Sequence, residues 1–209
     1  MGRVTWCLAV AGLLSLAALP ERAPAAPKPK GDDKPVLYLP TTLGDKRVLE
    51  STWNGKSAES AEWVTAVEAK AGMTVVSFAR EEGGPTLYRY GASADGMFRV
   101  SAGELVYDPP YRLLKLPLKE GETWEVESPA TPGNPSSKFK YTTGKEEEVE
   151  VPAGKFKAIR VEMENVINGA VFRTTYWHAP GAGMVKIVSH DHKRGDRVQV
   201  LKSFTPGKK

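Results

Sequence analysis

Apolar and polar residues alternate along much of the chain with the period of two residues that is typical of a β-strand. The alternation is clearest in four segments: Trp63–Ala69, Val149–Val151, Ile159–Met163 and Phe172–Tyr176. β-Branched and aromatic residues, which favour strands, dominate a fifth segment, Met73–Phe78. The pattern therefore predicts a protein built from β-strands.

Turn-forming sequences separate these segments at short intervals. This spacing leaves no room for the helical crossover that joins parallel strands, so neighbouring strands should be antiparallel. We therefore predict an all-β fold: a strongly curved antiparallel sheet or open half-barrel of about ten strands. The predicted turns are Asn54–Gly55, Glu82–Pro85, Asp95–Gly96, Pro152–Gly154, Asn168–Gly169 and Arg194–Asp196.

Two segments depart from simple alternation. Lys56–Ala71 contains alanine and glutamate residues that would tolerate a helix, but the alternation in its second half favours a strand. Further on, Phe156 and Ala158 share one parity, whereas Ile159 begins a run of the other parity. This change of phase predicts a β-bulge near Ala158–Ile159 that bends the sheet.

Three short sequences recur, in the same order, in the two halves of the chain. We interpret them as two repeats, about residues 36–107 and 113–204, that share one core and form a single β domain over residues 36–204. The alternative is that such turn sequences are common in any β protein. The recurring pairs are Leu39–Asp45 with Leu116–Glu122, Ala71–Gly72 with Ala153–Gly154, and Gly96–Val100 with Gly183–Ile187.

Five residues are expected to have structural roles. Gly44, Gly121, Gly154 and Gly183 stand at the recurring turns, where glycine gives the backbone its widest conformational freedom. Trp124 lies in the strand that follows Gly121 and is expected to anchor the core.

The N-terminus has the organisation of a secretory signal peptide. Arg3 precedes the apolar run Trp6–Leu19, Pro20 ends this run, and Ala23–Ala25 supplies small residues at the cleavage positions. The run is shorter than the about 20 residues that span a bilayer, so residues 1–25 are predicted to be cleaved. The alternative is a retained N-terminal anchor. Residues 26–35 are expected to form a disordered linker, and residues 205–209 a flexible tail.

The composition is that of an ordinary globular protein, with 41% hydrophobic and 26% charged residues. The single cysteine, Cys7, lies inside the apolar run rather than at its end, so neither a lipid anchor nor a disulfide is expected. The 29 basic and 25 acidic residues are interspersed, which argues against a nucleic-acid partner. We expect an exported protein with no transmembrane segment after cleavage, and either an apolar small molecule or an envelope protein as its partner.

Three segments carry motifs that read LPLKxGxxW, VxVPAGxFxA and YWxAPGxGxVK, at Leu116–Trp124, Val149–Ala158 and Tyr176–Lys186. With these motifs the chain resembles a family of bacterial exported proteins of unknown function over most of residues 36–204. The resemblance implies a β-rich domain in the periplasm or outside the cell, distantly similar to the half-barrel of bacterial lipoprotein carriers. It implies no catalytic residues. The first half departs from the pattern, since Arg47 stands where the second half has Trp124.

Aromatic residues supply a candidate ligand-binding surface. Tyr88, Tyr90, Tyr176 and Trp177 could line the concave side of the sheet and contact an apolar or amphiphilic ligand. The alternative is that these side chains pack in the core or against a sheet face, as aromatic residues ordinarily do.

His190 and His192 are the candidate metal ligands. They are two residues apart, so on a strand both imidazoles would share a face and could reach one divalent ion. A third ligand would have to come from His178 or from Glu146–Glu148. The alternative is a solvated hairpin end, because basic residues and a predicted turn follow directly.

No sequence motif for catalysis is complete. Gly55–Ser57 contains the end of a phosphate loop, but Glu50 occupies the position of its first glycine. We therefore predict a non-enzymatic exported binding module without a cofactor, which holds its ligand or a partner segment on its concave face. The alternatives are a structural or interaction module of the cell envelope without a ligand pocket, and a metal-dependent hydrolase that uses His190 and His192.

Overall fold

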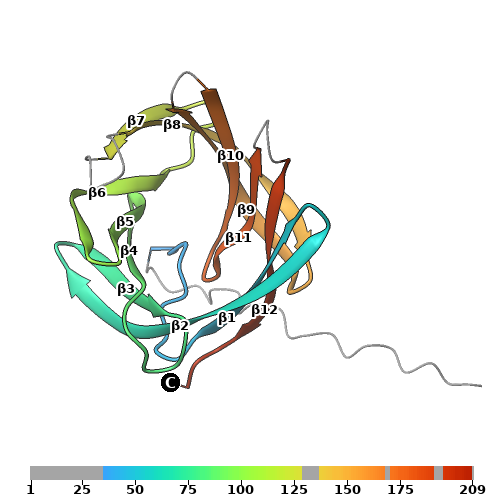
Figure 1. The fold of residues 1–209 in the computed structure, drawn as a ribbon. Helices are drawn as coiled ribbons and strands as arrows, with labels where there is room; N and C mark the ends of the chain where they lie inside the picture. Colours follow the sequence, from blue (N-terminus) through green and yellow to red (C-terminus); the bar gives the residue numbers. More distant parts are fainter. Residues whose placement is uncertain (1–34, 129–136, 168–169, 191–194, 209) are drawn as a thin grey trace, which may run out of the picture.

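The computed structural model describes residues 35–128, 137–167, 170–190 and 195–208, and every regular element in these ranges is a β-strand (Figure 1). The predicted all-β class is confirmed. None of the described segments forms a helix that could cross a membrane. The predicted signal peptide lies outside the described residues, as does nearly all of the predicted linker.

Twelve strands of the described residues form a single sheet, two more than the predicted number, and each pairs with its neighbours in antiparallel fashion. Lys56–Lys70, the segment that would tolerate a helix, is a strand. The strands are β1 (Lys46–Trp53), β2 (Lys56–Lys70), β3 (Met73–Ala79), β4 (Tyr88–Ser93), β5 (Gly96–Ala102), β6 (Leu105–Lys115), β7 (Thr123–Ser128), β8 (Ser137–Val151), β9 (Gly154–Ile167), β10 (Ala170–Ala179), β11 (Gly183–His190) and β12 (Arg197–Thr205).

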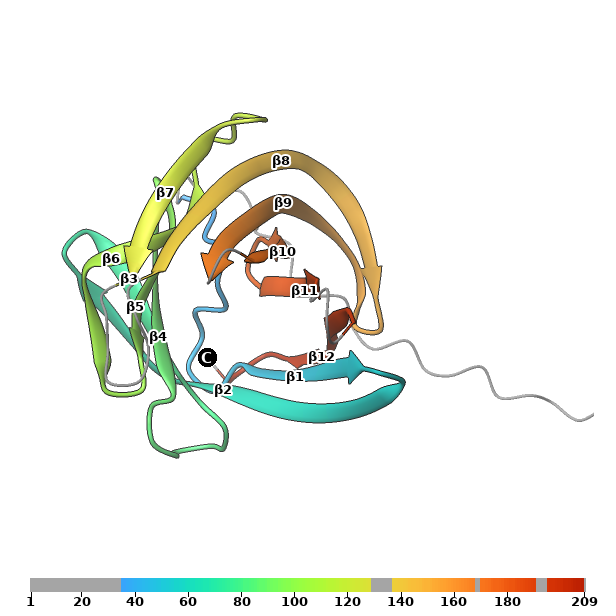
Figure 2. The same cartoon turned by 45° about the horizontal axis from the view of Figure 1, so that its top comes forward.

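The sheet curls into a nearly closed barrel with one seam (Figures 1 and 2). Strands β1 to β6 form one meander, β7 to β12 form the other, and β1 pairs with β12 to join them. The outer strands β6 and β7 meet at the seam without a backbone ladder in the described residues. Side chains bridge it instead: Lys115 Nζ lies 2.5 Å from Glu122 Oε1, and Trp124 Nε1 donates to the Arg112 carbonyl at 2.9 Å.

The turns that lead into β1 and β7 have matching hydrogen bonds. The Gly44 amide donates to the Val64 carbonyl at 2.9 Å, and the Gly121 amide donates to the Thr143 carbonyl at 2.7 Å. Both glycines have positive φ angles, of 81° and 77°. These matching turns and the six strands in each half support the predicted duplication, which itself stays a prediction.

Buried apolar residues form two clusters. The first fills part of the barrel interior and includes Val76, Phe78, Tyr90 and Val161. The chain before β1 runs inside the ring in both ribbon views and adds Leu39 to this cluster (Figures 1 and 2). This segment and the inward side chains of β3, β4 and β9 therefore leave only part of the interior open.

The second cluster forms where the tip of the β8–β9 hairpin reaches β12. The Ala153 amide donates to the Leu201 carbonyl at 3.1 Å, beyond the last residue of β12 that pairs with β11. Val149, Val151 and Phe156 pack there with Leu201. The hairpin tip thus occupies a backbone acceptor that the sheet itself leaves open.

The bulge predicted near Ala158–Ile159 lies instead on the opposing strand, β8. The register of β8 against β9 shifts between Thr143 and Glu146, whereas β9 pairs regularly with β10. Both Ala158 and Ile159 are buried because β9 is covered on both faces, with Ile159 in the first cluster and Ala158 in the second. The change of phase therefore marks a strand that passes from one cluster to the other.

Other structural residues lie at ends and edges of the sheet. Trp124 stacks on Tyr141 beside the seam, with ring centroids 5.3 Å apart, and is partly buried. Gly154 and Gly183 have positive φ angles where β9 and β11 begin. At the C-terminus, the predicted tail begins inside β12, and the Gly207 amide donates to Asp45 Oδ1 at 2.8 Å.

Candidate functional site

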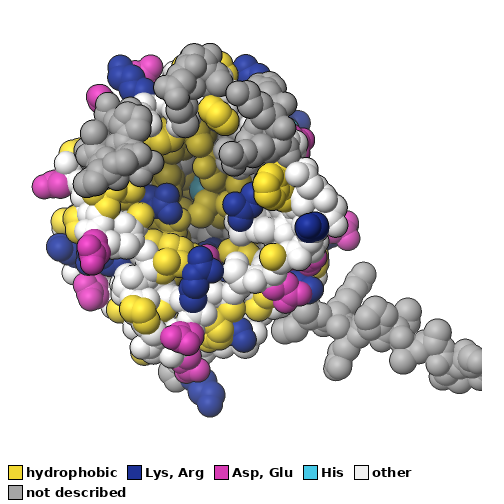
Figure 3. Space-filling model, in the orientation of Figure 1, with side chains coloured by type: hydrophobic (Ala, Val, Ile, Leu, Met, Phe, Trp, Pro, Cys, Tyr) yellow, Lys and Arg dark blue, Asp and Glu magenta, His cyan; other side chains and the backbone are white. Residues whose placement is uncertain are grey.

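A cavity of about 380 Å³ remains open inside the barrel (Figure 3). Its walls come from both halves of the chain, because alternate residues of β4, β6, β8 and β10 point inward. Five tyrosines contribute to the lining: Tyr88, Tyr90, Tyr111, Tyr141 and Tyr176. The cavity is therefore a mixed surface of aromatic rings and hydroxyl groups.

Apolar side chains form another part of the wall. Met163 of β9 and Met184 and Ile187 of β11 line the cavity together with Leu113 and Phe139. Methionine side chains are flexible and polarizable, so they adapt to ligands of irregular shape. The wall thus offers apolar contacts in addition to the tyrosine rings.

Arg47 and Glu62 form an ion pair in the cavity wall. They are direct partners in the β1–β2 ladder, and the Arg47 Nη2 atom binds Glu62 Oε2. Arg47 Nη1 also donates to the Ala182 carbonyl at 3.1 Å. Burial alone would lower the pKa of Arg47, but the Glu62 carboxylate and nearby tyrosines outweigh burial and raise this pKa above its ordinary value. The charge of Arg47 is therefore neutralised within the protein.

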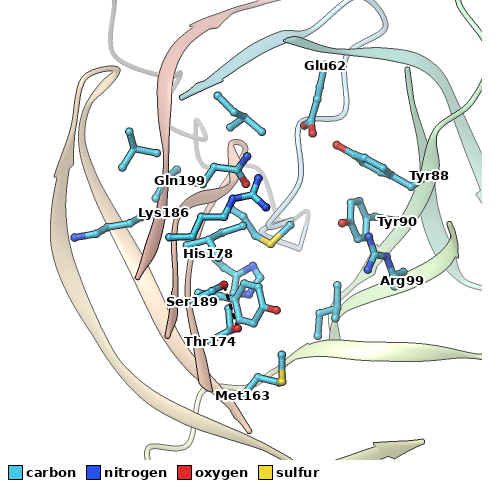
Figure 4. Close-up of a pocket in the computed structure, with 18 of the residues that line it drawn as sticks. Glu62, Tyr88, Tyr90, Arg99, Met163, Thr174, His178, Lys186, Ser189 and Gln199 are labelled. Atoms are coloured by element: carbon cyan, nitrogen blue, oxygen red, sulfur yellow. Dashed lines mark hydrogen bonds between the residues drawn. The ribbon is translucent and has the colours of Figure 1, made fainter. Parts of the chain in front are cut away.

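Arg99 of β5 enters the same cavity and has a different environment. Its guanidinium lies beside Tyr90, 5.6 Å from the ring centroid (Figure 4). In the described ranges Arg99 forms no ion pair, and its Nε atom has no hydrogen-bond partner. Burial raises the pKa of Tyr176 to about 12 and also raises the pKa values of Tyr90 and Tyr141. These hydroxyls are therefore neutral near pH 7, and none of them balances the arginine.

His178 of β10 lies deeper in the wall and is 1% exposed. Its ring centroid is 6.0 Å from that of Tyr176. Burial lowers the pKa of His178 to about 3, so the imidazole is neutral. Within the described structure neither ring nitrogen has a hydrogen-bond partner. In another part of the wall, the Thr174 hydroxyl donates a hydrogen bond to Ser189 Oγ at 3.2 Å (Figure 4).

Two solved structures are similar to this barrel. One is from Bacteroides fragilis NCTC 9343 and is named as an exported protein with a YmcC-like fold; it is 16% identical over 81% of this chain and 99% of its own, with a TM-score of 0.53. The other is from Parabacteroides distasonis ATCC 8503 and is named as a lipoprotein; it is 13% identical over 83% of this chain and 100% of its own, with a TM-score of 0.55. The chain has a YmcC-like fold.

The likeness extends over most of this chain and almost all of each neighbour, and at this level of identity it shows the YmcC-like fold alone. No protein-family model matches the chain. No curated protein matches it significantly either. What the barrel binds therefore follows from the chemistry of the residues in its interior.

Three of the four predicted ligand-binding residues line the cavity of this YmcC-like barrel. They are Tyr88 and Tyr90 of β4 and Tyr176 of β10. Trp177 follows Tyr176 on the same strand, does not line the cavity, and packs at the second cluster. Its Nε1 atom donates to Glu147 Oε1 at 2.6 Å.

The candidate metal ligands do not come together in the described residues. His190 is exposed at the end of β11, and its Nδ1 atom lies 3.0 Å from Asp196 Oδ1. His178, a proposed third ligand, is inside the barrel. His192 lies outside the described residues. Within those residues no group of three or more His, Cys, Asp or Glu side chains could hold a metal ion.

The charged residues of the cavity were not among the predicted site residues. Asn54 and Gly55 have φ angles of 48° and 71°, as a two-residue hairpin turn requires. Such a turn fixes the β1–β2 register and places Arg47 opposite Glu62. The Asn54–Gly55 turn could therefore have been used to predict the ion pair from the sequence. No comparable local signal marks Arg99, whose ladder contains bulges.

Acidification is expected to destabilise the protein through His178. The unfolded histidine titrates near 6.5 and the folded one near 3, so between these values only the unfolded state takes up the proton. Stability is therefore greatest above the unfolded pKa and falls as the pH drops. Lowering the pH from 6 to 5 should decrease the free energy of unfolding by about 1.2 kcal/mol through this residue.

The measurement is urea unfolding at both pH values. His178→Phe removes the titrating group and should lose this part of the pH dependence. His190→Gln is the control and should retain it, because His190 is exposed. An equal pH dependence in wild type and His178→Phe would contradict the assignment.

Proposed function

We propose that the protein is a non-enzymatic exported module that binds a small amphiphilic molecule inside its barrel. The observation that carries this proposal is the open cavity of about 380 Å³ between otherwise packed walls. Small-molecule sites have volumes of about 300 to 1,000 Å³ and are mostly apolar with a few polar groups. The methionines, tyrosines and charged groups of this cavity fit that description.

An exported location is part of the proposal. The N-terminal sequence predicts a secretory signal, and the two structural neighbours are named as an exported protein and a lipoprotein. A ligand held inside a barrel is shielded from water. Such shielding suits a molecule with an apolar part that has to remain dispersed outside the cytoplasm.

The uncharged fluorophore N-phenyl-1-naphthylamine, whose emission rises in apolar surroundings, tests the proposal. We expect saturable binding to the wild-type protein at one site. Ser189→Trp places a large ring at the cavity wall and should weaken binding at least about tenfold. His190→Trp adds the same ring at the next residue, which is exposed and does not line the cavity, and should bind like wild type.

Native mass spectrometry of the protein purified from its own envelope fraction gives a second measurement. The wild-type protein should carry a retained small molecule, and Ser189→Trp should carry less of it. Wild-type protein without saturable fluorophore binding and without a retained molecule would contradict the proposal. Equal losses in Ser189→Trp and His190→Trp would also contradict it, because the effect would then not come from the cavity.

A further inference from the structure

Three arginines line the cavity, namely Arg47, Arg99 and Arg197. Arg197 is exposed and donates to the Ser51 hydroxyl at 3.3 Å. Arg47 and Arg99 differ in how their charges are balanced. Arg47 pairs with Glu62, which is the one acidic residue among the residues that line the described cavity. Arg99 is surrounded by tyrosines, and those that interact with it electrostatically include Tyr90, Tyr107, Tyr141 and Tyr176. The Glu62 carboxylate is therefore already paired with Arg47, and Arg99 faces only neutral hydroxyl groups.

A guanidinium group cannot relieve this imbalance by losing its proton, since arginine remains charged in proteins. Arg99 is half-buried, and partial shielding of a charge from water without an opposite charge is unfavourable. Tyrosine rings contribute a cation–π attraction, as Tyr90 does here, but this is weaker than pairing with an anion. The free Nε atom of Arg99 also leaves a donor without an acceptor.

We propose that Arg99 binds the anionic group of the ligand, so that the cavity selects amphiphiles with a carboxylate or phosphate head. The planar guanidinium matches both groups with two parallel hydrogen bonds. The hydroxyl groups of Tyr90, Tyr141 and Tyr176 are protonated and supply additional donors. Met163, Met184 and Ile187 then contact the apolar part. This inference rests on the proposed ligand-binding function and names the class of ligand.

Displacement of N-phenyl-1-naphthylamine by three ligands of equal chain length tests the inference. Dodecanoate and dodecyl phosphate carry the two anionic heads, and dodecan-1-ol is uncharged. In the wild-type protein we expect at least one anion to bind at least about tenfold more tightly than the alcohol, as charge-assisted hydrogen bonds would require. The stronger of the two anions identifies the preferred head group.

Variants locate the effect at Arg99. Arg99→Gln should reduce the affinity for the anions to that for the alcohol. Arg99→Lys keeps the charge but loses the planar fork, so it should retain part of the preference. Arg173→Gln is the control, because Arg173 is exposed, pairs with Glu164 and does not line the cavity. This variant should bind all three ligands like wild type.

The outcomes separate the two proposals. Equal displacement by the alcohol and both anions in the wild-type protein would overturn the anion inference while leaving the binding function intact. An anion preference that survives in Arg99→Gln would overturn it as well. If Arg99→Gln does not fold, an unchanged preference in folded Arg99→Lys would overturn the bidentate contact. Absence of fluorophore binding in the wild type would instead contradict the binding function itself.

Discussion

Glu62→Gln is expected to decrease the free energy of unfolding by about 3 kcal/mol, because it leaves the Arg47 guanidinium buried without its counter-charge. The side chains are 3% and 12% exposed, so water replaces little of the lost interaction. Arg47 has no second carboxylate among its described partners, which otherwise include the Ala182 carbonyl, the Phe78 ring and two neutral tyrosines. For a chain of this size the loss corresponds to a decrease of roughly 6 to 12 °C in Tm.

Urea unfolding and thermal melts measure this effect. Glu164→Gln is the matched control, since Glu164 pairs with Arg173 at 2.8 Å but both side chains are exposed. Its change should stay within about 0.5 kcal/mol. The double variant Arg47→Met/Glu62→Leu removes both charges and should recover much of the loss. Equal effects of Glu62→Gln and Glu164→Gln would contradict a buried pair.

The fold class was predictable because alternation and turn residues act locally. About ten strands were predicted, close to the twelve in the described residues. Local pattern marks β6 only weakly, because it contains Pro109 and Pro110. Proline lacks the amide hydrogen that a central strand donates, so a sequence that contains proline does not indicate a central strand. In the structure β6 is an edge strand at the seam, where an unpaired side tolerates proline. Edge position is a property of the whole topology, so local pattern could not reveal it.

The site was predictable only for its aromatic residues. Tyr88 and Tyr90 share a parity on β4 and therefore face the same side. Trp177 is adjacent to Tyr176 on β10 and therefore faces the other side of the sheet, whereas His178 shares the parity of Tyr176 and lines the cavity. Arg99 interrupts the apolar face of β5, so its sequence environment resembles that of a solvent-exposed residue. The position of Arg99 in the cavity follows from the pairing of β5 with β4 and β6.

The structure links this site to the geometry of the β5–β6 hairpin. Gly96 begins β5 opposite Lys115 of β6, and the Leu116 amide donates to the Asp95 carbonyl at 2.9 Å. A Cβ atom at Gly96 would lie 1.9 Å from the Leu114 carbonyl oxygen. The backbone there also has a φ of 136°, a value that residues other than glycine rarely adopt. The two strands therefore approach one another only because residue 96 is glycine.

Gly96→Ala is consequently expected to decrease the free energy of unfolding by about 3 to 5 kcal/mol, since backbone strain adds to a collision with the neighbouring strand. Gly55→Ala is the control: its φ is also positive, but no atom lies within 4 Å of the new Cβ, so about 1 kcal/mol should be lost. Urea unfolding measures both. Because β6 carries Tyr111 and Leu113 into the cavity, displacement of this strand should also weaken fluorophore binding by folded Gly96→Ala protein. Equal losses of stability in the two variants would show that the close approach of β5 and β6 is not required.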